Sequence, residues 1–184
     1  MDKEQKLQPG GLFNLLLWAG FSCLLVLLDQ YTKYLAVLHL KGQKPFVLWS
    51  GVFELFYSEN RGAAFGMLQG RQTFFFLIGI LVLAAAVYVM LRLPSWKNSH
   101  YRWLGICVIL ITSGAVGNMV DRILQQYVVD FLYFKLIDFP IFNVADIYVT
   151  TATATLLFLM IFYYTDEDLD IFRFSQKEKG EKPL

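Results

Sequence analysis

Residues 12–28 read LFNLLLWAGFSCLLVLL, and DQYTK follows directly at 29–33. The first stretch has no charged side chain and is just long enough to cross a bilayer as a helix. In hydrocarbon each backbone N–H and C=O must bond within the segment, so a spanning block is helical. Because Lys3 and Lys6 precede it, a cleavable signal peptide is the alternative. Its length and its direct continuation into a polar segment favour a retained span.

Three further apolar blocks follow, at about 73–91, 103–120 and 147–164. The whole chain is 57% hydrophobic and only 17% charged, whereas soluble domains contain about 25% charged residues. The sequence therefore predicts an all-α membrane protein with four transmembrane helices. We expect residues 1–184 to form a single integral membrane domain.

A polar loop is expected at 40–72, between the first two spans. Within it, residues 45–57 read PFVLWSGVFELFY, which is β-branched and aromatic with a Ser-Gly turn. This pattern predicts a short β-hairpin outside the membrane. Glu54 is expected to face water on this hairpin, so Glu54→Gln should change activity little.

Lysine and arginine are enriched on the side of the membrane predicted to be cytoplasmic. If the N-terminus is inside, the segments 1–11, 92–102 and 165–184 hold nine basic residues in 42, against seven in 70 on the other side. The sequence thus predicts that both termini are cytoplasmic, with 165–184 as a tail. We assign no role to the acidic residues of that tail.

The remaining composition excludes several classes of function. The formal net charge of +1 gives no reason to expect a nucleic-acid partner. His39 and His100 lie far apart, and Cys23 and Cys107 each lie inside an apolar block. Neither a metal site nor a disulfide framework is expected from this pattern.

Polar residues collect near the ends of the spans that share the extracytoplasmic side. Ionisable residues at membrane depth are costly and usually mark function. Gly114, Ala115 and Gly117 precede one of these groups, and small residues allow close helix packing. We therefore expect a tight bundle with a pocket lined by carboxylates and amides near that surface. The polar set is Asp29, Lys33, Asn60, Gly62, Asn118, Asp121, Arg122, Asp130, Asn143 and Asp146.

Two of the acids have an opposite charge close by in the sequence. Asp29 lies four residues before Lys33, and Asp121 lies beside Arg122. A neighbouring opposite charge keeps a carboxylate ionised. We interpret both pairs as clamps between helices, and we expect Asp121→Asn mainly to harm folding.

Asp130 and Asp146 have no basic residue within four positions. If they lie close together, repulsion and burial would leave one proton shared between them. Such a pair can activate water against a peptide carbonyl. Asp138 is an alternative partner, although its place two residues before a proline is typical of a turn. Glu59 could tune the pair or face water.

Five short motifs together resemble the lipoprotein signal peptidases of bacteria, the signal peptidase II family. They occur in the order of that family and cover most of the chain outside the tails. The motifs are DQYTK at 29–33, NRGAAFG at 60–66, GNMVDR at 117–122, VVDF at 128–131 and FNVAD at 142–146. The glycines at 62 and 66 would let the backbone approach a ligand, or the segment is only a capped loop that enters the second span.

The resemblance implies an intramembrane aspartic endopeptidase that removes the signal peptide from diacylglyceryl-modified prolipoproteins, just before the lipidated cysteine. Asp130 and Asp146 would be the catalytic dyad. It also implies roles for the other motif residues: Asn60, Gly62, Asn118, Arg122 and Asn143 would bind substrate, and Asp29, Lys33 and Asp121 would support the site.

The same resemblance implies the bacterial cytoplasmic membrane, and we expect a monomer in contact with membrane lipids. No cofactor, metal or nucleic acid would be needed, and the site would lie near the extracytoplasmic face.

Two other classes of function are consistent with intramembrane acids. A proton-coupled transporter would carry polar residues through the depth of the bundle, whereas these crowd one side. Inverted repeats, which are common in transporters, are not evident in the sequence. A purely structural assembly protein would not explain two acids that lack local counter-charges.

Overall fold

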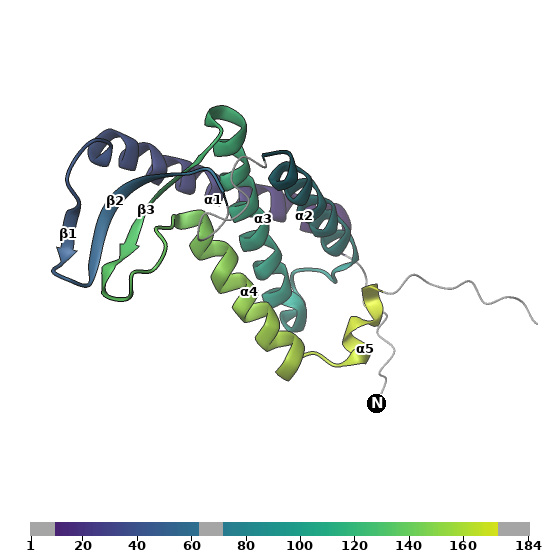
Figure 1. Ribbon diagram of the computed structural model, residues 1–184. Helices are drawn as coiled ribbons and strands as arrows, with labels where there is room; N and C mark the ends of the chain where they lie inside the picture. The colour runs from purple at the N-terminus through teal and green to yellow at the C-terminus, as the bar shows by residue number, and fades with distance from the viewer. Residues whose placement is uncertain (1–9, 63–71, 173–184) are drawn as a thin grey trace, which may run out of the picture.

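The computed structural model describes residues 10–62 and 72–172, in which four long helices form a bundle with a small sheet at one end (Figure 1). The helices are α1 (Gly11–Leu40), α2 (Gln72–Arg92), α3 (Ser99–Gln125) and α4 (Val144–Phe162). All four are long and apolar enough to cross a membrane. The predicted class, an all-α membrane protein with four transmembrane helices and a small β element, is confirmed.

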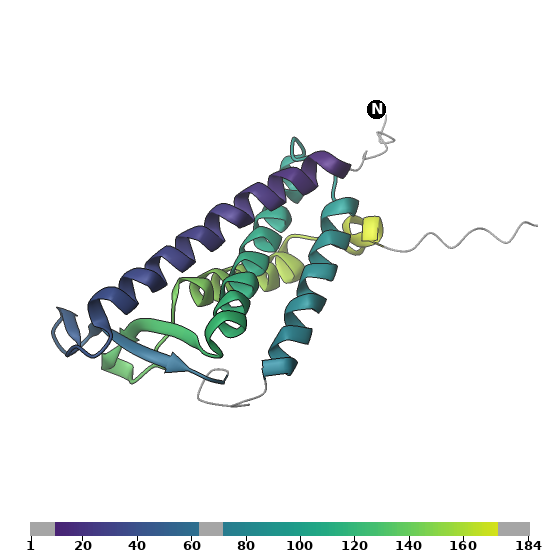
Figure 2. The ribbon, with the colours of Figure 1, turned by 90° about the horizontal axis from the view of Figure 1, so that it is seen from above.

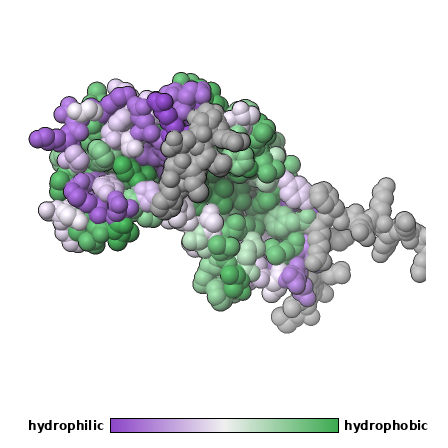
Figure 3. All heavy atoms as spheres, viewed as in Figure 1, coloured by the Kyte–Doolittle hydropathy of each residue, from purple (hydrophilic) through white to green (hydrophobic). Residues whose placement is uncertain are grey.

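Exposed apolar residues cover much of the surface of the helices. Leu12, Leu81 and Phe158 are all more than half exposed, which is the expected state of apolar side chains that meet acyl chains. Figure 3 shows apolar residues over the helices, whereas hydrophilic residues gather around the sheet. The polar end and the apolar body of the molecule are therefore distinct.

Helix α1 continues well past the apolar block 12–28, to Leu40. Asp29, Lys33 and Ala36 are all buried, and their spacing of four and three residues places them on one face of the helix. Ala36 packs there against Val129 and Phe131. Asp29 and Lys33 thus lie within a helix that is held by packing, rather than at its end.

Helices α3 and α4 approach closely because α3 carries glycines at the contact. A Cβ atom on Gly114 would meet the backbone oxygen of Ala145, and one on Gly117 would meet the carboxylate of Asp29. The Asp29 Oδ1 atom accepts a 2.9 Å hydrogen bond from the Ala145 backbone N–H, in the first turn of α4. Small residues therefore bring α1, α3 and α4 together at this level, as the sequence predicts.

The sheet has three antiparallel strands in the order β1-β2-β3 (Phe46–Trp49, Phe53–Asn60 and Val128–Phe134). The predicted hairpin is present as β1 and β2. Strand β3 is not predicted from the sequence, in which VVDF lies between two of the expected spans. Figure 2 shows the sheet lying beside the C-terminal end of α1.

The register between β2 and β3 brings two distant motifs together. Ser58 pairs with Asp130, and Asn60 pairs with Val128. Side chains two residues apart on a strand share a face, so Asn60 lies on the same face as Ser58 and diagonally opposite Asp130. Pairing of β2 with β3 therefore sets an asparagine amide against this carboxyl group.

Glu54 does not face water as predicted. Its side chain is buried, and it accepts a 2.7 Å hydrogen bond from Lys135 Nζ. Glu54 pairs with Tyr133 of β3, so β2 is the central strand, and Lys135, which follows β3, lies against the Glu54 side chain. Sequence alternation alone gave no sign of this third strand.

Glu54→Gln is expected to destabilise the sheet modestly. The Lys135 end of the pair is half exposed, so solvent weakens the charge interaction, and we expect a loss of about 1 kcal/mol in the free energy of unfolding. Thermal unfolding in detergent measures this loss, with Lys135→Gln as the matched variant. An unchanged melting temperature in both variants would show that the pair contributes nothing.

Part of the predicted tail folds back at the end of the bundle opposite the sheet (Figure 1). It forms α5 (Asp166–Leu169) and a 3-10 turn η3 (Asp170–Phe172). The Tyr101 hydroxyl donates to the Asp168 carbonyl at 2.9 Å. The remainder of the tail, the N-terminal lysines and the AAFG part of the second motif lie outside the described residues.

Candidate active site

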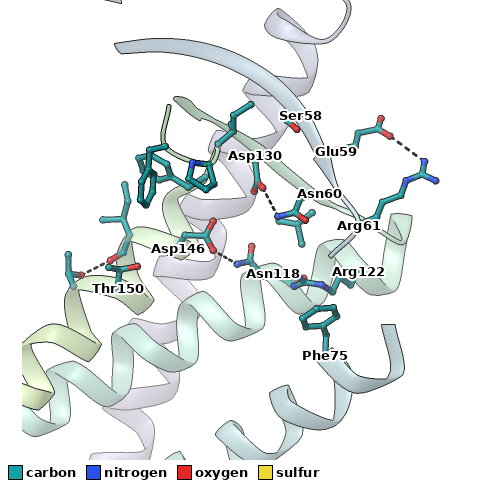
Figure 4. Close-up of a pocket in the computed structure, with 17 residues that line it drawn as sticks. Ser58, Glu59, Asn60, Arg61, Phe75, Asn118, Arg122, Asp130, Asp146 and Thr150 are labelled. Carbon is teal, nitrogen blue, oxygen red and sulfur yellow. Dashed lines mark hydrogen bonds and ion pairs between the residues drawn. The ribbon is translucent and has the colours of Figure 1, made fainter. Parts of the chain in front are cut away.

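A cavity of about 730 Å³ lies at the sheet end of the bundle. Its walls come from α2, α3, β2, β3, the loop 139–142 and the first turns of α4. Asp130 and Asp146 both line it, and Figure 4 shows both carboxyl groups turned into it. The two acids without local counter-charges are thus brought together, as the sequence predicts.

Asp130 is buried on β3 and is held by two side-chain amides. Its Oδ2 atom accepts a 2.9 Å bond from Asn60 Nδ2, and its Oδ1 atom accepts a 2.7 Å bond from Asn143 Nδ2. Burial, followed by the nearby Asp146 carboxylate, raises the pKa of Asp130 to about 7. This carboxyl group can therefore hold a proton near neutral pH.

Asp146 occupies the first turn of α4, in a reciprocal cap with Asn143. Asn143 Oδ1 accepts from the Asp146 backbone N–H at 3.0 Å, and Asp146 Oδ2 accepts from the Asn143 backbone N–H at 3.1 Å. The other carboxylate oxygen accepts a 2.8 Å bond from Asn118 Nδ2. The helix start and α3 together thus hold this acid in one orientation.

Asn143 connects the two acids and is fully buried. Its side-chain oxygen caps α4, so its NH₂ group must point away from the helix, towards Asp130 Oδ1 and Asn118 Oδ1. The spacing of Asn143 and Asp146 is that of a helix cap. This spacing is visible in the sequence, whereas the second contact to Asp130 is not.

Asn60 is oriented by the backbone that follows it. Its Oδ1 atom accepts a 2.9 Å bond from the Gly62 N–H, which leaves its NH₂ group for Asp130. Gly62 itself contributes only backbone atoms, and its carbonyl accepts a 3.0 Å bond from Arg122 Nη2. Asn60 and Gly62 therefore belong to the site as one turn.

Arg122 lies on the cavity wall. The prediction that it pairs with Asp121 is wrong. The guanidinium donates to the backbone carbonyls of Gly62 and Asn118 and stacks on Phe75, 4.3 Å from the ring centre. Asp121 instead forms a 2.9 Å ion pair with Lys33. Adjacent residues on a helix point in different directions, so sequence neighbours are poor partners.

The predicted supporting residues form one buried cluster that contacts Asn118 of the cavity wall. Lys33 Nζ lies 2.8 Å from Asp29 Oδ2 and 2.9 Å from Asp121 Oδ2, which confirms the Asp29–Lys33 pair. Asp121 Oδ2 also accepts from the Val129 N–H at 3.2 Å. The cluster thus joins α1 and α3 to the strand that carries Asp130.

Asp121→Asn is expected to lower stability. It removes one of two carboxylates that balance a buried ammonium, and we expect a loss of about 2 kcal/mol, which is less than for a fully unpaired buried charge. Melting temperature in detergent tests this, with the exposed Asp138→Asn as control. A normal melting temperature for Asp121→Asn would contradict its role as a support.

The other two acids considered from the sequence, Asp138 and Glu59, each have a partner of their own. Asp138 is exposed in a turn with φ of 48° and accepts from the Tyr133 hydroxyl at 2.6 Å, as its sequence context predicts. Glu59 lies on the cavity rim, where the Lys41 ammonium at 3.0 Å lowers the pKa of its carboxyl group. Its charge is therefore already balanced.

Some cavity residues were not predicted. Phe75 of α2, Thr150 and Thr151 of α4 and the apolar loop 139–142 all line the cavity. They are ordinary residues of apolar or weakly polar segments, and the sequence gives no local signal that distinguishes them.

Comparison with known proteins gives consistent matches. The family described as Signal peptidase (SPase) II matches residues 21–162. A lipoprotein signal peptidase of Caldanaerobacter subterraneus subsp. tengcongensis is 44% identical over 138 residues, which are 74% of this chain and 90% of that protein. One from Streptococcus pyogenes serotype M1 is 40% identical over 147 residues, 79% of this chain and 91% of that protein.

Two solved structures share the fold. Both are described as bacterial membrane enzymes determined by the in meso method, at 2.3 and 1.9 Å resolution. The first has a TM-score of 0.70 and 30% identity over 90% of this chain and 94% of that chain. The second has a TM-score of 0.68 and 31% identity over 80% and 94%.

Proposed function

Because this chain belongs to the signal peptidase II family, we propose that it is an intramembrane aspartic endopeptidase. It removes the signal peptide from diacylglyceryl-modified prolipoproteins by cleavage just before the lipidated cysteine. The observation that carries the aspartic mechanism is the pair of carboxyl groups, Asp130 and Asp146, in one cavity at the end of a membrane bundle. Three asparagine amides donate to this pair.

The chemistry follows from a dyad that holds one proton. Asp130 is fully buried whereas Asp146 is partly exposed to the cavity, and the pKa of Asp130 is raised to about 7; Asp130 is therefore assigned as the acid and Asp146 as the base. Asp146 takes a proton from water while the water oxygen attacks the scissile carbonyl carbon, and Asp130 protonates the carbonyl oxygen. The tetrahedral diol then collapses as the C–N bond breaks: Asp146 gives its proton to the cysteine nitrogen, and Asp130 takes back a proton from a diol hydroxyl as the C=O bond re-forms. The products are a signal peptide with a free carboxylate and a lipoprotein with a free amino terminus.

The other predicted site residues divide into two groups. The first group donates hydrogen bonds from side-chain NH₂ groups to the dyad and consists of Asn60, Asn118 and Asn143. Their primary task is therefore to hold the carboxyl groups in place. Arg122 and Gly62 present a cation and a backbone turn at the cavity wall. These two are the better candidates for direct contact with the substrate.

The position of the cavity suits a lipid-modified substrate. Ile147, Thr150 and Thr151 line it from α4 and are exposed on that helix, which has the length of a membrane span. A substrate anchored by acyl chains can therefore reach the acids from within the bilayer. We place this end of the bundle at the extracytoplasmic face of the cytoplasmic membrane, with both termini cytoplasmic, as the distribution of lysine and arginine favours.

A proton-coupled transporter is less well supported. The core at the opposite end is apolar and includes Met90, Leu104, Cys107 and Leu159. At mid-depth the Thr112 hydroxyl is engaged by Trp18 and by its own helix. Polar groups that are satisfied locally do not form a relay through the described part of the bundle.

The direct test is cleavage of a purified diacylglyceryl prolipoprotein in lipid, followed by mass measurement of the products. The proposal predicts a mature fragment that begins with the modified cysteine. The same prolipoprotein without diacylglyceryl is the control and should be cut far more slowly. Cleavage elsewhere, or no cleavage by the folded protein, would contradict the proposal.

A further inference from the structure

We propose that Lys33 is a positioning residue of the dyad, and that it acts through the Asn118 amide to hold an N–H donor against Asp146. The inference rests on the proposed function and adds a role to a residue expected only to support the bundle. Lys33 is 3% exposed, and α1 carries it into the space between α3 and the sheet. A buried ammonium is costly unless each of its N–H groups has a hydrogen-bond partner.

The ammonium has three hydrogens, and each has a partner. Two go to the carboxylates of Asp29 and Asp121 at 2.8 and 2.9 Å. The third goes to Asn118 Oδ1 at 2.9 Å. A clamp between helices requires only the carboxylates, so the bond to a neutral amide is the contact that the clamp does not explain.

An asparagine side chain has an acceptor at one end and donors at the other. Because Asn118 Oδ1 faces the Lys33 ammonium and also accepts from Asn143 Nδ2 at 3.1 Å, its NH₂ end must face the opposite way. There it meets Asp146 Oδ1 at 2.8 Å. A half-turn of the amide would place NH₂ against the ammonium and oxygen against the carboxylate, and both contacts would be repulsive.

Lys33 therefore reaches the dyad indirectly. Within the described part of the chain its bonds go to Asp29, Asp121 and Asn118, and Asn118 is the one that touches a dyad carboxyl group. The other two amides are oriented by backbone N–H groups, of Gly62 for Asn60 and of Asp146 for Asn143. Asn118 Oδ1 instead accepts from two side chains, the Lys33 ammonium at 2.9 Å and the Asn143 amide at 3.1 Å, and Lys33 provides the shorter and charged bond.

The charge of Lys33 has a second effect that can be measured. The charged groups around Asp130 are Lys33 from α1, Arg122 from α3 and Asp146 from α4. A cation nearby favours ionised Asp130, so loss of Lys33 should raise the pKa of Asp130 further. The pH at which activity falls on the alkaline side should then increase.

The first experiment is a double-mutant cycle on cleavage of the diacylglyceryl prolipoprotein. Lys33→Met and Asn118→Ala should each lower kcat about a hundredfold, since misplacement of a catalytic group by about 1 Å costs that much. KM should change much less. The kcat of the double variant should lie within about threefold of that of the slower single variant, because the two substitutions remove the same interaction. Multiplication of the two losses would overturn the proposal.

The pH profile separates positioning from mere support. Lys33→Met should move the alkaline limb of kcat/KM upward by about 0.5 to 1 unit. Asp121→Asn, which removes a negative charge and keeps the Lys33–Asn118 bond, should lower stability without an upward shift. An unmoved limb in Lys33→Met would show that Lys33 is only structural.

Loss of folding in Lys33→Met is controlled by two further variants. The charge-balanced double variant Lys33→Met/Asp121→Asn is compared with Asp121→Asn alone. The ratio of their kcat values should equal the loss that Lys33→Met causes in the wild type. Asn118→Asp keeps Lys33 intact, retains an oxygen for it and loses the donor to Asp146. It should fold and lose as much kcat as Asn118→Ala, whereas near-normal kcat would refute the assigned amide orientation. Failure of the wild type to cleave at all would instead reject the proposed function.

Discussion

Asp130→Asn and Asp146→Asn are each expected to lower kcat by about four orders of magnitude, because each removes one half of the proposed acid–base pair. An asparagine at 130 cannot give a proton to the carbonyl oxygen, and one at 146 cannot take a proton from water. Both variants still line the cavity, so substrate binding should persist. The two losses should not multiply in the double variant, since the pair acts as a unit.

The hydrogen bonds around Asp130 mean that Asp130→Asn also affects stability, so folding needs its own control. Both oxygens of Asp130 accept N–H bonds, from Asn60 and Asn143, so an asparagine there must turn its NH₂ against one donor. A lower melting temperature is therefore expected for Asp130→Asn, and folding must be verified. Asp138→Asn is the matched control, because this exposed acid is outside the cavity and should retain full turnover. Turnover within tenfold of wild type in either dyad variant would reject the pair as the catalytic group, allowing for the usual range of general acid–base effects.

Asn143→Ala is expected to lower kcat by about a hundredfold to a thousandfold, comparable to loss of one preorganised donor in other hydrolases. The Asn143 side chain caps α4 through its oxygen and donates through its NH₂ group to Asp130 and to Asn118 Oδ1. Its removal leaves Asp130 with one amide donor and removes the N-cap of α4. Steady-state cleavage of the diacylglyceryl prolipoprotein measures the loss.

A matched variant separates the two tasks of Asn143. Threonine retains an oxygen that can cap a helix but has no NH₂ group. Asn143→Thr should therefore recover about 1 kcal/mol of stability relative to Asn143→Ala, while kcat stays low. Recovery of kcat together with stability would mean that the cap, and not the amide donor, accounts for the loss.

The four spans could be predicted from the sequence because hydrocarbon imposes a strong constraint on composition and length. The gathering of Asp29, Asn118, Asp130 and Asp146 could also be predicted, since parity of the spans places their ends on one side. Neither inference needs tertiary detail.

Other features depend on tertiary contacts that leave no local pattern. Strand β3 forms because β2 offers an edge to 128–134, and the segment after β3 brings Lys135 against Glu54 of a hairpin expected to face water. Asp121 pairs with Lys33 of another helix rather than with its neighbour Arg122. The direction of each asparagine amide depends on partners as distant in sequence as Lys33 and Asn118.

The central claim, a dyad that holds one proton with Asp130 as the acid, is tested most directly by the pH dependence of kcat/KM with the diacylglyceryl prolipoprotein. Asp130 has its pKa raised to about 7, so it loses its proton as the pH passes that value, and the proton it must donate is then absent. We predict a bell-shaped profile whose alkaline limb falls tenfold per pH unit above about 7. A rate that stays constant or increases up to pH 9 would contradict the account, because the enzyme would then work with both carboxyl groups ionised.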